Sequence, residues 1–174
     1  MFKKNKMPVQ TRPPIYIYTD GAAAGNPGPG GYGAVLICGT LRKEISGGFR
    51  LTTNNRMELM AVIKALEAIK WPGSTVHLTS DSSYVVKAVN EGWLQDWVRK
   101  GFKGKKNQDL WERFLPLYKA HNVKFYWIKG HDGHPENERC DTLAVEARLE
   151  ENLPADTGYE ELNTTLTNNL YDEQ

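Results

Sequence analysis

The sequence has few cysteines and no long apolar run. Its two cysteines among 174 residues, Cys38 and Cys140, are too few for a disulfide framework, so we expect buried, reduced thiols. No run is long and apolar enough to span a membrane, so no membrane partner is expected. The first 14 residues are basic, but no apolar stretch of the kind found in secretion signals follows them. These absences together predict a cytoplasmic protein.

Basic residues are missing from the C-terminal end of the chain. Residues 151–174 carry six acidic side chains and no Lys or Arg, and the whole chain has a formal net charge of +1, so residues 1–150 carry +7. A basic body favours a polyanionic partner. The length fits one domain with one core. We therefore divide the chain into a basic tail (1–14), a domain (15–150) and an acidic tail (151–174).

Hydrophobic periodicity predicts a chain of mixed strands and helices. Runs rich in β-branched and aromatic residues indicate five strands, over residues 15–20, 32–40, 41–50, 74–80 and 123–128. Helix starts are expected within Thr52–Asn55, at Ser82–Ser83, near Asn107 and at Pro135. The first three strands predict an antiparallel meander, and the strand–helix–strand order that follows predicts a parallel crossover.

Four carboxylates stand at the edges of these elements or on their helices. Asp20 and Asp81 each follow a strand, and a parallel crossover would place them side by side. Glu58 is expected in the first turn of its helix, and Asp141 lies within the last one. Three of them also have ordinary explanations: Asp20 could initiate a turn, Glu58 could compensate a helix dipole, and Asp81 could cap its helix.

A converging set of four carboxylates would repel itself unless a hard cation occupied it. Oxygen ligands suit Mg²⁺ or Mn²⁺, and the sequence offers no Cys/His set that would suit zinc. Two such ions about 4 Å apart can activate an attacking water and stabilise a leaving oxygen. Together with a polyanionic partner, this chemistry predicts phosphodiester hydrolysis.

Aromatic and basic side chains alternate between Trp93 and Trp111. Residues 99–106 hold five cations and no anion, and three of these cations are Lys103, Lys105 and Lys106. A solvated helix face would explain a run of charge. The interleaved aromatic residues favour instead a surface that binds a nucleic-acid backbone.

The Gly-rich loop before Pro135 holds a histidine. A lone loop histidine is usually only solvated. Because His131 precedes the helix that carries Asp141, we predict that it assists proton transfer or product release.

Four segments, in this order, resemble bacterial ribonuclease HI, a type 1 RNase H: TDGAAAGNPGPGGYG, TTNNRMEL, SDSSYV and GHDGHPENERCD. The resemblance spans roughly residues 15–150. It implies an α/β RNase H-like fold: a mixed five-stranded sheet, three antiparallel strands followed by parallel additions, with helices on both faces. It also implies an endoribonuclease that cuts the RNA strand of RNA–DNA hybrids with two Mg²⁺ ions, which Mn²⁺ could replace, and leaves 5′-phosphate and 3′-hydroxyl ends. We expect a monomer.

The same resemblance implies roles for individual residues. It makes metal ligands of Asp20, Glu58, Asp81 and Asp141, and a mobile auxiliary catalytic residue of His131. It assigns contacts in the minor groove of the hybrid to three asparagines, Asn26, Asn54 and Asn55. It lines a channel for the DNA strand with Tyr84 and Trp93, and a pocket for a DNA phosphate with Thr53 and Asn107. It identifies residues 93–111 as a basic protrusion, which includes Lys103, Lys105 and Lys106.

Three features depart from the family pattern. Relatives often carry an Arg where this chain has Leu51, and a longer side chain such as Gln where it has Ser83. The loop 102–107 is also shorter than in the best-known bacterial form. These departures bear on hybrid affinity and leave the chemistry in place.

Other functions fit parts of the pattern. A recombinase or junction nuclease could use the same kind of site, but normally needs further DNA-binding domains. A non-catalytic hybrid-binding module would not need all four acids. A Ca²⁺-binding protein with an EF-hand loop would need its acids much closer together in sequence.

The acidic tail has few apolar residues, and Pro154 and Gly158 interrupt any helix that continues from Asp141. This composition predicts flexibility. Its leucines and tyrosines could still dock a short segment on the body, with the negative charge drawn towards the basic protrusion.

Overall fold

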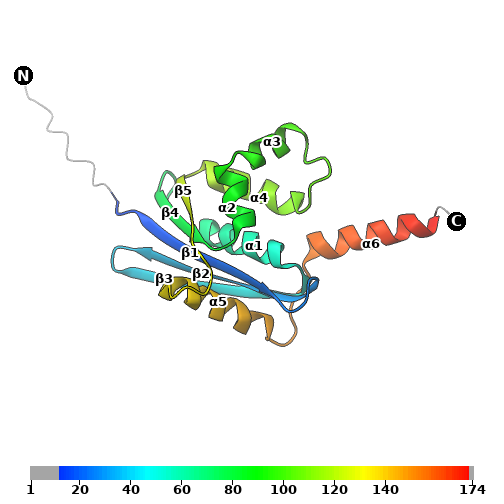
Figure 1. The fold of residues 1–174 in the computed structure, drawn as a ribbon, viewed down its shortest axis with the longest axis horizontal. Coiled ribbons are helices and arrows are strands. Elements are labelled where there is room, and N and C mark those ends of the chain that lie inside the picture. Colours follow the sequence, from blue (N-terminus) through cyan, green and yellow to red (C-terminus); the bar gives the residue numbers. More distant parts are fainter. Residues whose placement is uncertain (1–11, 173–174) are drawn as a thin grey trace, which may run out of the picture.

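The computed structural model describes residues 12–172, so most of the predicted basic tail (1–14) lies outside the described residues. Figure 1 shows a single sheet with helices on both sides of it. None of the helices in residues 12–172 is both long and apolar enough to cross a membrane.

The sheet has five strands and a mixed topology. The strands are β1 (Ile15–Ala23), β2 (Gly28–Cys38), β3 (Leu41–Thr52), β4 (Thr75–Ser80) and β5 (Asn122–Trp127), in the spatial order β3-β2-β1-β4-β5. The strands β1, β2 and β3 pair antiparallel, whereas β4 pairs in parallel with both β1 and β5. The predicted meander and parallel crossover are therefore confirmed.

The first strand is longer than the sequence predicted. It does not end at Asp20 but runs to Ala23, because residues 20–23 continue the antiparallel pairing with β2. Its parallel pairing with β4 does stop, after Thr19 and Ser80. Asp20 is therefore a strand-end residue only on the β4 side.

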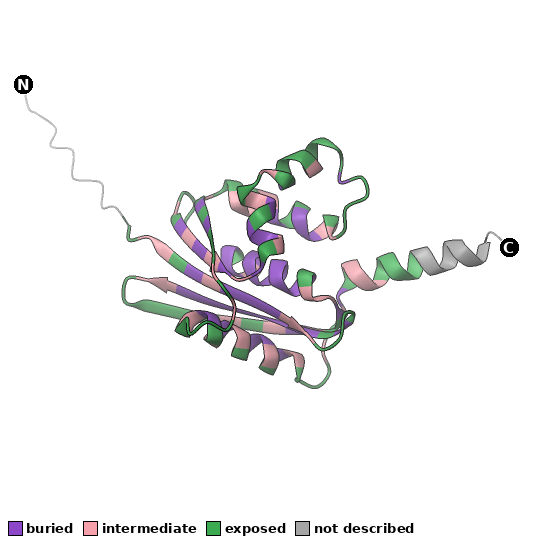
Figure 2. Ribbon diagram, viewed as in Figure 1, coloured by how far each residue is buried: buried purple, intermediate pink, exposed green. Residues whose placement is uncertain are grey.

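Helices cover the two faces of the sheet unequally (Figure 1). One side carries α1 (Asn54–Glu67), α2 (Ser83–Asn90), α3 (Trp93–Arg99) and α4 (Gln108–Lys119), and the other carries α5 (Pro135–Arg148). The main core lies on the α1 side and includes Ile17, Leu59, Leu78, Trp111 and Phe114. A smaller cluster of Val35, Cys140 and Leu143 lies under α5. The buried residues in Figure 2 follow the sheet and α1.

Local sequence explains where α1 begins. Thr53 is its N-cap, and the side-chain oxygen of Thr53 accepts a hydrogen bond from the backbone nitrogen of Arg56 at 3.3 Å. Apolar residues then occur on several sides of the helix, so α1 is buried almost all round. This buried helix carries Glu58 into the interior.

The acidic tail is ordered where its composition predicted flexibility. After Asp156 the chain forms α6 (Thr157–Asp172), which projects away from the sheet in Figure 1. The backbone nitrogen of Arg50 donates to the Pro154 carbonyl at 2.9 Å, and the Arg50 side chain pairs with Glu160 at 2.7 Å. The tail thus pairs with Arg50 of the body, and no ion pair among the described residues joins it to Lys103, Lys105 or Lys106. Composition missed the Arg50–Glu160 pair because its two residues lie 110 positions apart.

Candidate active site

Three of the four predicted carboxylates converge. Asp20 on β1, Glu58 on α1 and Asp81 just after β4 each place an oxygen within 4.8 Å of an oxygen of the other two. Asp20 and Asp81 meet because each is the first residue beyond the parallel pairing of β1 with β4. The expectation that these two lie side by side is confirmed.

Glu58 reaches the cluster from the second turn of α1. Because α1 begins at Asn54, Glu58 is not in the first turn, and dipole compensation does not explain it. Its side chain is 6% exposed. One carboxylate oxygen, Oε1, accepts from Asn54 Nδ2 at 3.5 Å, and the other, Oε2, is buried without a hydrogen-bond partner. Such an orphaned buried oxygen is costly unless a ligand binds it.

The cluster is electrostatically unfavourable by itself. Burial, followed by the charges of Asp20 and Asp81, holds the pKa of Glu58 well above its usual range. Burial and the charge of Asp81 likewise raise the pKa of Asp20 to about 7, against a hydrogen bond from the Gly21 nitrogen that lowers it. Among the described residues none of the three acids is in a salt bridge.

Asp141 lies beside the cluster and not within it. It is half-buried on α5 and does not join the set of oxygens within 4.8 Å. Its negative charge nevertheless contributes to the raised pKa of Asp20. The structure therefore brings three predicted ligands together and leaves the fourth as a close neighbour.

Asn137 is a site residue that the sequence did not reveal. It is buried one helical turn before Asp141, and its Nδ2 donates to Asp81 Oδ2 at 3.3 Å. Its own Oδ1 has no hydrogen-bond partner. The only available signal was the i, i+4 spacing to Asp141, which places both side chains on one face of α5.

Asp81 is held by its surroundings and does not cap α2. Ser82 is the N-cap of that helix, and its oxygen accepts from the Val85 nitrogen, so the capping explanation for Asp81 is wrong. The carbonyl of Asp81 accepts from Trp127 Nε1 at 2.9 Å. A Cβ added at Gly130 would lie 2.4 Å from Asp81 Oδ2, so a larger residue there would displace the Asp81 carboxylate.

His131 directly follows Gly130, the residue that approaches Asp81. It is exposed, and its φ of 54° lies in the left-handed region. Gly130 thus brings the loop to Asp81 and leaves the imidazole at the solvent side of the site.

Asparagines from the β1–β2 loop and from the start of α1 meet beside the cluster. The backbone nitrogen of Asn54 donates to Asn26 Oδ1 at 3.2 Å, and Asn54 Oδ1 accepts from the Ala23 nitrogen at 3.3 Å. Asn54 therefore joins the β1–β2 turn to Glu58, while Asn26 and Asn55 stay exposed.

A second group of predicted residues gathers around α2 and α4. The Tyr84 hydroxyl accepts from Asn107 Nδ2 at 3.1 Å and from Trp111 Nε1 at 2.9 Å. Asn107 precedes α4 with a φ of 63°. Trp93 opens α3 and is 40% exposed. These hydrogen bonds hold the Tyr84 ring and the Asn107 amide together, next to the loop that carries Lys106.

The basic protrusion consists of α3, a loop and α4, and α4 begins next to Asn107 as predicted. Phe102 is buried and anchors the loop between α3 and α4. The loop exposes its cations, Lys103, Lys105 and Lys106. The ammonium of Lys105 lies 5.3 Å from the centre of the Trp97 ring.

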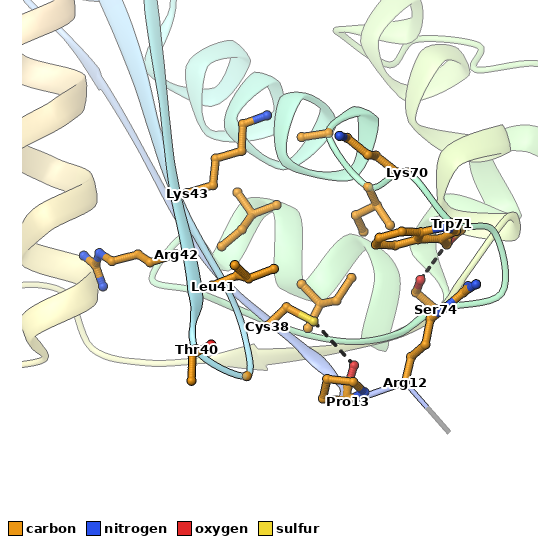
Figure 3. Close-up of a pocket in the computed structure, with 15 residues that line it drawn as sticks. Arg12, Pro13, Cys38, Thr40, Leu41, Arg42, Lys43, Lys70, Trp71 and Ser74 are labelled. Atoms are coloured by element: carbon orange, nitrogen blue, oxygen red, sulfur yellow. Dashed lines mark hydrogen bonds between the residues drawn. The ribbon is translucent and has the colours of Figure 1, made fainter. Parts of the chain in front are cut away.

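A separate cavity of about 640 Å³ lies at the start of β1 and the β2–β3 turn (Figure 3). Its lining includes Leu41 and Trp71, with Arg12 stacked 4.8 Å from the Trp71 ring centre. No predicted site residue lines it. The carboxylate cluster therefore lies apart from this cavity.

Comparisons with known sequences point to one family. The RNase H family model matches residues 12–148. A ribonuclease H of Syntrophus aciditrophicus (strain SB) is 55% identical over 150 residues, which cover 83% of this chain and 86% of that protein.

Solved structures agree. LC9-RNase H1, a type 1 RNase H with the type 2 active-site motif, aligns with a TM-score of 0.71 and 32% identity, covering 87% of this chain and 81% of that one. LC11-RNase H1, solved in complex with RNA/DNA hybrid, aligns with a TM-score of 0.56 and 30% identity, covering 76% of this chain and 95% of that one. Sequence, fold and the convergence of acidic residues lead to one conclusion: this chain belongs to the RNase H family of ribonucleases.

Proposed function

We propose that the protein is an endoribonuclease that hydrolyses the RNA strand of RNA–DNA hybrids and leaves 5′-phosphate and 3′-hydroxyl ends. The convergence of Asp20, Glu58 and Asp81 carries this proposal. A relative solved with RNA/DNA hybrid, LC11-RNase H1, supports the choice of substrate.

The donor set fits a hard divalent cation. It consists of carboxylate oxygens, has no cationic partner among the described residues, and includes the unpartnered Oε2 of Glu58. Oxygen-only sites of this kind suit Mg²⁺, and Mn²⁺ as a substitute. We assign as ligands of two ions Asp20, Glu58, Asp81 and Asp141. When bound, the ions would activate a water and stabilise the leaving oxygen.

The chain's own residues position these ligands and assist with protons. Asn137 orients the Asp81 carboxylate through its hydrogen bond to Oδ2. Asn54 holds Glu58 in the same way. His131, at the solvent side of the cluster, is proposed to accept a proton or to help product leave.

The remaining predicted residues form a surface for the hybrid. We assign the minor groove to Asn26, Asn54 and Asn55, because amide side chains can reach the 2′-hydroxyl that distinguishes RNA from DNA. We assign the DNA strand to Tyr84 and Trp93, and one DNA phosphate to Thr53 and Asn107. We assign backbone attraction to the exposed Lys103, Lys105 and Lys106. A single chain supplies all of these groups, so we propose a monomer that acts in the bacterial cytoplasm.

A substrate panel tests the proposal. The protein is incubated with Mg²⁺ and hybrid, duplex RNA, duplex DNA or single strands, with each strand labelled in turn. We expect cleavage of the RNA strand of the hybrid alone, with 3′ ends that a polymerase can extend. Cleavage of duplex DNA, or an intact hybrid, would overturn the assignment.

A further inference from the structure

Arg56 is a buried cation held by two carboxylates. Its side chain is 1% exposed. It donates to both oxygens of Asp109, at 2.8 and 2.7 Å, and to both oxygens of Asp156, at 2.7 Å each. Bidentate pairs of this kind fix geometry as well as charge. Arg56 is therefore one of the most firmly oriented side chains in the protein.

Asp156 reaches this cluster from the segment beyond α5. It lies outside residues 12–148, the part matched by the family model. It is 3% exposed, and its Oδ2 also accepts from Thr52 Oγ1 at 2.6 Å. A Cβ added at Gly158 would lie 2.0 Å from Asp109 Oδ2, so the backbone here is shaped to close over the cluster. The segment is thus built around Arg56.

The same arginine connects two parts of the proposed hybrid surface. Its backbone nitrogen donates to Thr53 Oγ1 at 3.3 Å, and its Nη1 lies 3.5 Å from Asn107 Oδ1. Asp109 lies in the first turn of α4, directly after Asn107 and Gln108. Asn107 in turn donates to Tyr84. Arg56 therefore ties the start of α1 to the start of α4.

Charge alone would not make this cluster favour a phosphate. Two carboxylates outweigh one guanidinium, so the cluster repels an anion at its surface. Any gain in substrate binding must therefore come from geometry. Because its N–H groups are paired with both carboxylates, the Arg56 side chain cannot turn outward. The distance between the start of α1 and the start of α4 is therefore fixed.

We propose that Asp156 is a positioning residue for hybrid binding: through Arg56 it holds Thr53 and Asn107 at the spacing that one backbone phosphate of the substrate requires. This inference rests on the proposed function, because it assigns a role at that same surface. It makes the segment after α5 part of the substrate-binding apparatus.

The first test compares Asp156→Asn with wild type in the full-length protein, well below the melting temperature of both. We expect KM for the hybrid to rise about tenfold, by analogy with the lower end of the loss of metal affinity when hydrogen-bond partners of metal-binding side chains are removed. The value of kcat should change by less than about twofold, since the carboxylate cluster is untouched. A fall in KM would mean that Asp156 acts by repulsion, and would overturn the proposal.

Matched variants separate positioning from general stability. Glu160→Gln removes the exposed Arg50–Glu160 pair from the same helix, and should leave KM unchanged. Thr52→Val keeps all charges and removes one hydrogen bond to Asp156, so KM should rise in the same direction by less. A rise in KM with Glu160→Gln equal to that with Asp156→Asn would also overturn the proposal.

The decisive readout replaces DNA-strand phosphates one at a time with neutral methylphosphonates. In wild type, replacing the linkage that Thr53 and Asn107 hold should raise KM. Asp156→Asn should lose the sensitivity at that linkage and keep it at linkages next to Lys103, Lys105 and Lys106. Each protein is its own reference, so partial unfolding does not affect the ratio. The same sensitivity in both proteins, or no sensitive linkage in wild type, contradicts the inference. A wild type that does not cut hybrid at all contradicts the proposed function instead.

Discussion

Gly21 on β1 packs directly against the backbone of Glu58 on α1: a Cβ added at Gly21 would lie 2.3 Å from the Glu58 nitrogen. This contact sets the distance between strand and helix next to Asp20. It explains how a strand residue and a helix residue place their carboxylates at one point. The glycine after Asp20 therefore serves the close packing of β1 on α1.

Gly21→Ala should damage both stability and cleavage. The added methyl meets backbone atoms, which cannot rotate away, and overpacking typically costs about 1–3 kcal/mol. We expect a lower melting temperature and a lower kcat, as Glu58 moves from Asp20. Gly73→Ala is the control, because its Cβ meets no atom within 4 Å and only its φ of 72° is strained. Equal kcat for both variants would show that the Gly21 contact does not set the site.

Glu58→Gln should stabilise the metal-free protein at neutral pH. Burial and the charges of Asp20 and Asp81 raise the pKa of Glu58, so the folded state binds a proton that the unfolded state has lost. Stability of the wild type in chelator should therefore fall as pH rises above the usual range of a carboxyl group, and the raised pKa of Asp20, about 7, adds to that fall. The variant should lose less over that window.

The readout is the melting temperature with chelator and with Mg²⁺. A gain of about 1 kcal/mol raises the melting temperature by about 2–4 °C in a protein of this size. Mg²⁺ should raise that of the wild type and have little effect on Glu58→Gln. Glu91→Gln, at an exposed position, is the control for loss of one anion. If the melting temperature of the wild type changes with neither pH nor Mg²⁺, then charge repulsion among the three acids does not destabilise the metal-free protein.

Sequence patterns predicted the sheet and most of the carboxylate cluster for a physical reason. Parallel strands end at the same edge, so residues that follow them, Asp20 and Asp81, meet wherever the register brings them level. Glu58 was placed on the correct helix but one turn too early. Its burial follows from α1 packing on the strand at Gly21, which no local pattern reports.

Contacts between distant segments were beyond the sequence. Asn137 bonds Asp81 across 56 positions, and Asp156 bonds Arg56 across 100. Neither residue has an unusual local setting, and an acidic tail with few apolar residues has the composition of a flexible segment. The segment is ordered because the buried Arg56 pairs with both Asp109 and Asp156. Only the folded chain shows that these three residues meet.

His131→Ala should slow turnover without abolishing it. The imidazole is exposed at the edge of the site, so its loss should cost at most about 100-fold in kcat, the low end for acid–base catalysis. His131→Asn is the matched control, because Asn tolerates the left-handed backbone found there. Recovery of activity with Asn would assign the effect to the backbone rather than to the ring.

Replacing Lys103, Lys105 and Lys106 by Gln should raise KM for the hybrid and flatten its salt dependence. For every phosphate that the variant no longer neutralises, the slope of log K against log salt should fall by about 0.9, as for duplex DNA. A triple variant of Lys43, Lys70 and Lys119 changes net charge equally at exposed positions elsewhere. Identical slopes for both triple variants would make the lysine loop an ordinary solvated surface.

If Asp20, Glu58 and Asp81 hold the divalent ions needed to cut the RNA strand, replacing Asp81 by Asn should stop cleavage. Asp81 is the member of the cluster nearest to solvent, and its replacement removes one charge with little change of shape. Asp132→Asn, in the exposed loop nearby, is the control. Cleavage of labelled hybrid in Mg²⁺ is measured beside hybrid binding by fluorescence anisotropy. We expect no detectable cleavage by Asp81→Asn. Hybrid binding should be largely retained, and the melting temperature should equal or exceed that of wild type. Cleavage at a rate near that of wild type would contradict this role of Asp81.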